Sequence, residues 1–308
     1  MERGAPDALE IRPQEERDAS AATALRHEAD DADVGTEAGW LHRRSRIQPR
    51  HGVLGLAAEL DGQVVATGQA GLNVETTAPG ASWANIKVSS AFRRRGIGSA
   101  LHGALLDHLR QIGAREVTTF LRRTDEGERW AAARGWRRLL TGPLIALDPR
   151  GVTEPTPPPG FECVSTGVFD RPEAIFELTR VAIIDEPNPV PADDLRYEDW
   201  LDDWEDPDLD HDASTLVVHG ELPVTFAYVK IAGTRAQHVG TATLPDYRGR
   251  GLATAAKRHA LRAAAAKGVT RITTSNAEEN AAMRAINRKL GFEPIGEHII
   301  MGRSVDPS

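Results

Sequence analysis

The sequence has a single cysteine, Cys163, among its 308 residues. One cysteine excludes a disulfide within the chain and is typical of a protein from a reducing compartment. No apolar run approaches the ~20 residues of a membrane-spanning helix, and the first residues, Met1 to Arg17, lack the apolar core of a signal peptide. These absences predict a cytoplasmic protein without a membrane partner.

An excess of basic residues is also missing. The chain has 37 Lys and Arg against 45 Asp and Glu, a formal net charge of −8. Proteins that bind nucleic acid without sequence preference are normally basic. The composition therefore argues against a nucleic-acid partner and is compatible with a cationic small substrate. The ten histidines and one cysteine show no metal-ligand spacing, so no metal site is predicted.

One segment, rich in arginine and glycine, is present twice. Residues 93–100 (RRRGIGSA) return 155 positions later as residues 248–255 (RGRGLATA), and the same offset places Leu106 on Leu261. Both copies have the pattern of a strand, a glycine-rich turn, a long helix and a strand. The repeat is too long for a solenoid unit and predicts two copies of one domain, in agreement with the usual ~150 residues per domain.

A proline-rich segment separates the copies. Residues 149–160 cannot form a helix or a central strand, because they include Pro149, Pro155, Pro157, Pro158 and Pro159. We therefore predict a first domain over 8–148, a linker over 149–160 and a second domain over 161–304. The predicted fold class is α+β, with two tandem domains that each have a mostly antiparallel central sheet flanked by helices.

The repeated turn has the composition of an anion site. Unpaired N–H groups at the start of a helix attract anions, and glycines let the backbone approach them closely. In the second copy the residues suited to this are Arg248, Gly249, Arg250, Gly251, Ala253 and Thr254. In the first copy they are Arg93, Arg94, Arg95, Gly96, Gly98 and Ser99. Neither copy has the Gly-Lys-Ser/Thr of a P-loop, and the antiparallel strands that precede the turn argue against a dinucleotide fingerprint.

The pattern R-x-x-G-x-G/A, after a strand and opening a long helix, resembles the GNAT superfamily of acyl-CoA N-acyltransferases. The second copy adds Asn276, Asn280 and the segment 287–292 (NRKLGF), which is similar to the second cofactor segment of that family. The resemblance covers nearly the whole chain as a tandem pair. It implies acetyl-CoA, or another acyl-CoA, as the cofactor.

The resemblance also implies where the cofactor is held. The backbone of the turn is expected to bind the coenzyme A pyrophosphate, and the strand before it is expected to splay from its neighbour over Thr241 to Leu244. The implied contacts in the second copy are Thr243, Leu244, Arg248, Gly249, Arg250, Gly251, Leu252, Ala253, Thr254, Asn276 and Asn280. Those in the first copy are Val88, Arg93, Arg94, Arg95, Gly96, Ile97, Gly98 and Ser99. A helix N-cap is the structural alternative for Asn280.

The catalytic groups are less well defined. Many family members place a tyrosine as general acid about five residues before the Leu-Gly-Phe phenylalanine, but Asn287 stands there. A thiolate is a fair leaving group, so water or a backbone donor could suffice. His238, on the strand before the turn, is a candidate base with a suitable ordinary pKa, and Glu186 is a second candidate. A histidine on the surface of the sheet is the structural alternative for His238.

An acidic segment distinguishes the second copy. Residues 199–212 carry eight carboxylates together with Trp200 and Trp204. This composition fits a pocket for a cationic amine, with cation–π contacts, or a solvated loop, and we favour the loop because charge runs are usually solvated.

The leading hypothesis is an enzyme, an acetyl-CoA-dependent N-acetyltransferase that acts on the primary amine of a small molecule by direct transfer. We expect the second domain to be catalytic, because the first has Leu121 and Asp125 or Glu126 where its partner has Asn276 and Asn280. The alternatives are a non-catalytic acyl-CoA-binding or scaffold protein, and a protein N-acetyltransferase.

Overall fold

The computed structural model describes residues 9–184 and 187–306. They form two compact units. Unit 1 contains the chain up to Thr141 and again from His298 onward, and unit 2 is Gly142–Glu297. Each unit has one mostly antiparallel sheet with helices on its faces, so the predicted α+β class is confirmed.

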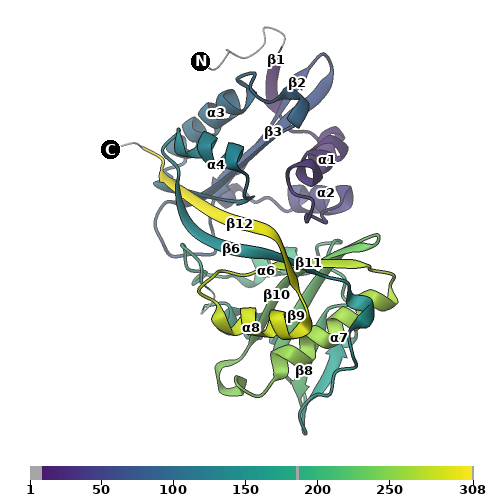
Figure 1. Cartoon of the computed structure of the whole chain (residues 1–308). Helices are drawn as coiled ribbons and strands as arrows, with labels where there is room; N and C mark the ends of the chain where they lie inside the picture. Colours follow the sequence, from purple (N-terminus) through teal and green to yellow (C-terminus); the bar gives the residue numbers. More distant parts are fainter. Residues whose placement is uncertain (1–8, 185–186, 307–308) are drawn as a thin grey trace. The chain divides into compact units, whose positions relative to one another are not determined.

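The sheet of unit 1 has six strands in the order β1 (Leu9–Pro13), β2 (Leu54–Leu60), β3 (Gln63–Leu72), β4 (Ala81–Val88), β5 (Glu116–Arg122) and the His298–Ser304 part of β12 (Glu293–Ser304). All neighbours are antiparallel except β4 and β5. Figure 1 shows α1 (Ala19–Ala29) and α2 (Glu37–Ser45) on one side of this sheet, and α3 (Ile97–Gln111) and α4 (Asp125–Ala132) on the other.

Local sequence explains the best-defined elements of unit 1. Asp61 and Gly62 both have positive φ, 51° and 80°, which is the backbone that a two-residue hairpin between β2 and β3 requires. On α3, Ile97, Leu101 and Leu105 recur at helical spacing and are buried against the sheet. The side chains of α3 therefore form the centre of this core.

The sheet of unit 2 has the order β7 (Glu162–Ser165), β8 (Thr215–His219), β9 (Leu222–Ala232), β10 (Arg235–Thr243), β11 (Arg271–Ser275) and the Leu144–Leu147 part of β6 (Arg137–Leu147). Only β10 and β11 are parallel. Its helices are α5 (Pro172–Ala182), α6 (Tyr197–Trp204), α7 (Leu252–Ala266) and α8 (Ala281–Leu290).

The two faces of β9 belong to different cores. Ala227 and Val229 pack in the cluster that contains the apolar residues of α7. Phe226 and Tyr228, which alternate with them, pack in an aromatic cluster with residues of α5 and α6. Because side chains alternate along a strand, this pattern identifies the face of each β10 residue that pairs with β9.

Short 3₁₀ helices connect these elements. They are η1 (Glu16–Asp18), η2 (Pro49–His51), η3 (Ser90–Phe92), η4 (Pro149–Gly151), η5 (Thr166–Val168) and η6 (Pro245–Tyr247). Apart from η4, the proline-rich residues 149–160 have no helix or strand, and all of them are described. Within the described ranges no helix is both long and apolar enough to cross a bilayer.

The compact units differ from the two sequence copies by one strand each. The last strand of the first copy, β6, pairs through Leu144–Leu147 with β11 of unit 2. The last strand of the second copy, β12, pairs through His298–Ser304 with β5 of unit 1. Each sheet is therefore completed by a strand from the other copy, whereas the sequence repeat places each strand with its own copy.

Candidate functional site

The two glycine-rich turns have the same backbone. Gly96, with φ of 80°, precedes α3, and Gly251, with φ of 79°, precedes α7. Two positions earlier, Arg94 and Gly249 also have positive φ, 63° and 75°. Such a left-handed backbone is natural for glycine and rare for arginine. The two segments that begin at Arg93 and Arg248 therefore share the backbone conformation of the turn as well as its sequence pattern.

The first arginine of each turn is fixed in the same way. The Nε of Arg93 donates to the carbonyl of Val88 at 3.2 Å, and the Nε of Arg248 donates to the carbonyl of Thr243 at 3.1 Å. Both bonds reach back to the end of the preceding strand, β4 or β10. These side chains therefore fasten the turn to the strand that leads into it.

The third arginine of each turn repeats a second pair of contacts. Arg95 and Arg250 each donate to the backbone carbonyl four residues earlier, at 3.3 and 2.9 Å. Each guanidinium also lies 5.2 Å from an aromatic ring centre, that of Phe92 or Tyr247. Since these arginines bind the chain behind the turn, an anion would be held chiefly by the N–H groups that open α3 and α7.

The turns differ in the charge beside them. In unit 1 the Glu126 carboxylate lies 3.7 Å from Arg93 and 3.6 Å from Arg94. The positions 155 and 156 residues later in unit 2 are Ala281 and Ala282. A carboxylate at the turn opposes a second anion, so Glu126 makes the unit 1 turn less suited to a pyrophosphate.

Behind each turn the parallel strands separate. The pairing of β10 with β11 ends at Gln237 opposite Thr273, while β10 stays paired with β9 as far as Thr243. In unit 1 the pairing of β4 with β5 ends likewise, at Trp83 opposite Thr118. The expected splay is present, and it begins closer to the start of β10 than Thr241.

Three buried polar atoms border the splay of unit 2. They are Nε2 of His238, Oγ1 of Thr241 and Oδ1 of Asn287, and each lacks a hydrogen-bond partner within the described chain. His238 and Thr241 lie opposite Val229 and Ala227 on β9, hence on the α7 face. Buried polar atoms are nearly always satisfied. A ligand with amides and hydroxyls, such as a pantetheine arm, would supply the missing partners.

His238 is buried rather than on the surface of the sheet, with 4% of its area exposed. Burial, and then the charge of Lys257, hold the pKa of His238 well below its ordinary value. Such an imidazole is neutral at pH 7 and a weak proton acceptor. Its proposed role as a base is therefore less favourable than a role as a hydrogen-bonding group.

Sequence analysis missed Lys257 on α7, which is only 1% exposed. Its Nζ lies 5.7 Å from the ring centre of Phe292, and burial lowers its pKa to about 7. The sequence repeat could have indicated Lys257, because the offset of 155 aligns it with another titratable residue, His102 of α3. His102, which is partly buried, also contacts an aromatic residue of its own copy, since its Nε2 accepts the Trp136 Nε1–H at 3.1 Å.

The two asparagines of the second cofactor segment have structural partners. The Asn280 side chain accepts the Met283 N–H at 3.1 Å and caps α8. Asn276 follows β11, and its Oδ1 accepts a hydrogen bond from Asn287 Nδ2 at 2.7 Å. The residue in place of the usual tyrosine therefore orients a residue expected to contact the cofactor.

Replacing Asn280 can separate capping from cofactor binding. We expect Asn280→Ser to keep the cap, since serine is an equally good N-cap, while Asn280→Ala lowers the free energy of unfolding by about 0.5–2 kcal/mol. Both variants are expected to bind acetyl-CoA about 2- to 10-fold more weakly, the value of one hydrogen bond. Thermal unfolding and calorimetric titration measure the two effects. Wild-type affinity in both variants would leave Asn280 as a cap only.

The other expected residues are placed as follows. Ile97 and Leu252 are buried in the cores of unit 1 and unit 2, so they can offer only backbone groups to a ligand, and the partly buried Leu244 packs against the unit 2 core. Ser99 accepts a hydrogen bond from Arg134 through its hydroxyl at 2.8 Å. Gly98, Ala253 and Thr254 lie in the first turns of α3 and α7. Glu186 lies outside the described residues.

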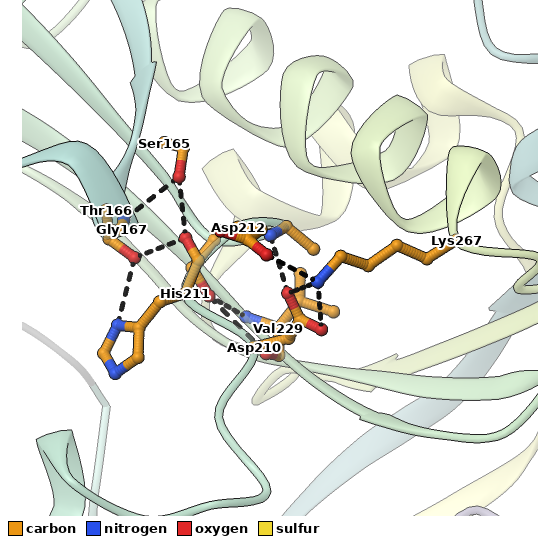
Figure 2. A network of polar contacts seen from close by, with 10 residues as sticks. Ser165, Thr166, Gly167, Asp210, His211, Asp212, Val229 and Lys267 are labelled. Atoms are coloured by element: carbon orange, nitrogen blue, oxygen red, sulfur yellow. Dashed lines mark hydrogen bonds and ion pairs between the residues drawn. The ribbon is translucent and has the colours of Figure 1, made fainter.

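The acidic segment is bound to lysines of unit 2. Asp206, which is buried, pairs with Lys230 at 2.8 Å. Figure 2 shows Lys267, just after α7, reaching Asp210 at 2.6 Å and Asp212 at 3.1 Å. Trp200 and Trp204 stack on each other at 5.2 Å between ring centres. These three carboxylates are structural ion-pair partners, an interpretation that differs from both the amine pocket and the solvated loop.

A model of the acetyltransferase (GNAT) family matches residues 17–134 and again residues 177–292. The chain belongs to the GNAT family of acetyltransferases. Its two matched segments contain the two turns described above, and the predicted tandem architecture is confirmed.

Solved structures of GNAT proteins share the fold over the whole chain. A tandem GNAT protein from the clavulanic acid biosynthesis pathway aligns with a TM-score of 0.74 and 20% identity, over 97% of this chain and 99% of that one. A GCN5-related N-acetyltransferase from Sphaerobacter thermophilus aligns with a TM-score of 0.70 and 17% identity, over 99% and 98%. No protein of curated function matches this GNAT chain in sequence.

Proposed function

We propose that this GNAT protein is an acetyl-CoA-dependent N-acetyltransferase that acts on the primary amine of a small molecule, with the principal cofactor site in unit 2. The observation that carries the proposal is the coincidence of two features at one end of β10. The left-handed turn at Gly249 and Gly251 opens α7 beside the splay. Unsatisfied polar atoms of His238, Thr241 and Asn287 border the same splay.

Different residues of unit 2 would bind different parts of the cofactor. The N–H groups that open α7, from Gly251 to Thr254, would hold the pyrophosphate, because helix N-termini bind phosphate groups. The splayed part of β10 and the orphaned side chains would pair with the pantetheine amides. When bound, the acyl-CoA supplies a thioester carbonyl that a neutral amine can attack.

Asn287 bears on the mechanism. It cannot donate a proton as a tyrosine hydroxyl would, so protonation of the leaving thiolate falls to solvent. Its amide instead holds Asn276 at the end of β11. The same substitution supports the second candidate function, an acyl-CoA-binding or scaffold protein without turnover, and the absence of thiol release with every amine of a panel would favour that candidate.

Calorimetric titration of acetyl-CoA into wild type, Gly251→Glu and Gly251→Ala tests the cofactor site. An added Cβ at position 251 meets no atom within 4 Å, so alanine introduces only the strain of a positive φ. We expect Gly251→Ala to bind acetyl-CoA and Gly251→Glu to lose at least about 100-fold in affinity, because a like charge at a phosphate costs several kcal/mol.

Gly96→Glu completes the series. If it removes a second, weaker binding event, both units bind the cofactor, and the Glu126 carboxylate accounts for the weaker affinity of unit 1. If wild type binds no acetyl-CoA, the proposed function is wrong.

A further inference from the structure

A buried histidine–carboxylate pair lies in unit 1, away from the residues discussed so far. The Nε2 of His298, on β12, lies 2.7 Å from Oδ2 of Asp30, which directly follows α1. His298 is 2% exposed. Its other nitrogen, Nδ1, is buried and has no hydrogen-bond partner among the residues that the structure describes. Nδ1 of His298 is therefore available to a ligand as a hydrogen-bonding atom.

The pair lies at the splayed end of β4 and β5, on the face opposite α3. Val117 of β5 packs in the α3 core, so Phe120 and Arg122 point to the other face. His298 is paired with Arg122, and its ring centre is 4.6 Å from that of the exposed Phe120. Figure 1 shows α1 and α2 on this face. A cofactor that enters the splay from the α3 turn would meet an acceptor that approaches from the α1–α2 side.

The carboxylate of Asp30 selects the tautomer of the imidazole. The carboxylate accepts a hydrogen bond from Nε2–H, and this tautomer leaves the lone pair on Nδ1. Burial has the largest single effect on the pKa of Asp30 and raises it, but the hydrogen bond and charge of His298, the Ala32 N–H and the charge of Arg122 together hold the pKa below its ordinary value. Asp30 is thus ionised at neutral pH, and its carboxylate orients the imidazole ring as a carboxylate does beside a histidine base.

Two further charged groups, Arg122 and Lys87, interact with Asp30, and Arg26 and Asp33 in turn interact with Lys87. Arg26 and Asp33 form their own ion pair at 2.8 Å. Burial lowers the pKa of Lys87, whose other charged neighbours include Asp30. Asp30 is the carboxylate that contacts the imidazole, at 2.7 Å.

We propose that unit 1 carries a second acyl-transfer site, in which Asp30 orients His298 and Nδ1 of His298 accepts a proton from a primary amine. The nitrogen forms a C–N bond with the thioester carbonyl carbon as its proton passes to Nδ1. The C–S bond then breaks, and the thiolate leaves with the electron pair and takes up a proton from His298 or water. The inference rests on the proposed acyl transfer, and it adds a second site whose base comes from the second sequence copy.

The experiment uses full-length Gly251→Glu, in which the unit 2 turn is blocked, and measures thiol release from acetyl-CoA with a panel of primary amines. In this background, His298→Gln keeps a donor for Asp30 but cannot accept a proton, and Asp30→Asn removes the orienting charge. His102→Gln is the matched control, because His102 is a partly buried, hydrogen-bonded histidine of unit 1 on the α3 side.

We expect Gly251→Glu to retain turnover with at least one amine. His298→Gln should then lower kcat/KM about 100-fold or more, the usual contribution of a general base. Asp30→Asn should lower it about 10- to 100-fold, and His102→Gln should leave it within about 2-fold. The rise of kcat/KM with pH through one ionisation should vanish in His298→Gln. Gly96→Glu should remove the turnover that Gly251→Glu leaves.

Three results would overturn the inference. If wild type turns over and Gly251→Glu does not, unit 1 is inactive and the proposed function stands. If Gly251→Glu/His298→Gln is folded, by thermal unfolding, and keeps its turnover and pH profile, the pair is only structural. If wild type binds acetyl-CoA but releases no thiol with any amine, the proposed function fails and the second site fails with it.

Discussion

A chain that ends after Glu297 is expected to have an unfolded unit 1 beside a folded unit 2. The truncation removes the strand segment His298–Ser304, which completes the unit 1 sheet next to β5. It also removes Ile299, Met301 and Val305 from the core, where each is at most 1% exposed. Burial of three such side chains contributes about 5–9 kcal/mol, which is comparable with the whole stability of a domain.

Hydrogen exchange with mass spectrometry measures this directly. Backbone amides of β2, β3 and β4 should exchange at unfolded rates in the truncated chain, while those of β9 and β10 keep their protection. The control is a chain that ends after Val305, which loses the exposed pair of Arg110 with Asp306 and should change stability by at most about 1 kcal/mol. Wild-type protection of β3 in the shorter chain would show that unit 1 does not need β12.

Replacing Lys257 with methionine is expected to stabilise unit 2 substantially. Burial lowers the pKa of Lys257 to about 7, against 10.5 for an ordinary lysine. Since a pKa change of 1 corresponds to about 1.4 kcal/mol, removing the amine should raise the free energy of unfolding at pH 6 by about 3–5 kcal/mol. Methionine keeps the contact with the Phe292 ring, because its sulfur packs well on aromatic rings.

The gain should depend on pH with a defined sign. Between pH 7 and 10.5 the unfolded chain holds a proton on Lys257 that the folded chain has lost, so wild-type stability rises with pH through this window. The advantage of Lys257→Met should therefore be largest below pH 7 and nearly vanish by pH 10. Urea unfolding at several pH values measures it. Lys267→Met is the control, since that lysine pairs with Asp210 on the surface and should show no such gain. A gain that is constant from pH 6 to 10 would contradict the buried-amine account.

The hairpins, helices and turns that the sequence predicts best are those whose conformation depends on a few adjacent residues. The hairpin at Asp61 and Gly62 needs two positive φ values, and both are found. The long helix predicted after the first glycine-rich turn is α3, which begins at Ile97 and ends at Gln111. The turn at Gly251 was predicted from its glycines and the repeat, and its left-handed backbone is present. In these cases the local preference and the fold agree.

Other features depend on contacts that no local pattern encodes. The exchange of β6 and β12 leaves the residue order of each copy unchanged, so the repeat could not reveal it. The pairing of Asp30 with His298 joins positions that are 268 residues apart. The helix α2 was not predicted, because few apolar residues mark its buried side, where Trp40 is the main one.

The exchanged strands also set an order of events during synthesis. The edge of β5 ends at Arg122, and its partner is complete only when Ser304 has been made. At about 5–20 residues per second the ribosome needs roughly 10–35 s to cover that interval. Throughout this time β5 presents an unpaired edge, which is a template for association with other chains. The first half of this protein is therefore the last to mature, and its yield in the cell depends on how well that edge is protected until the chain is finished.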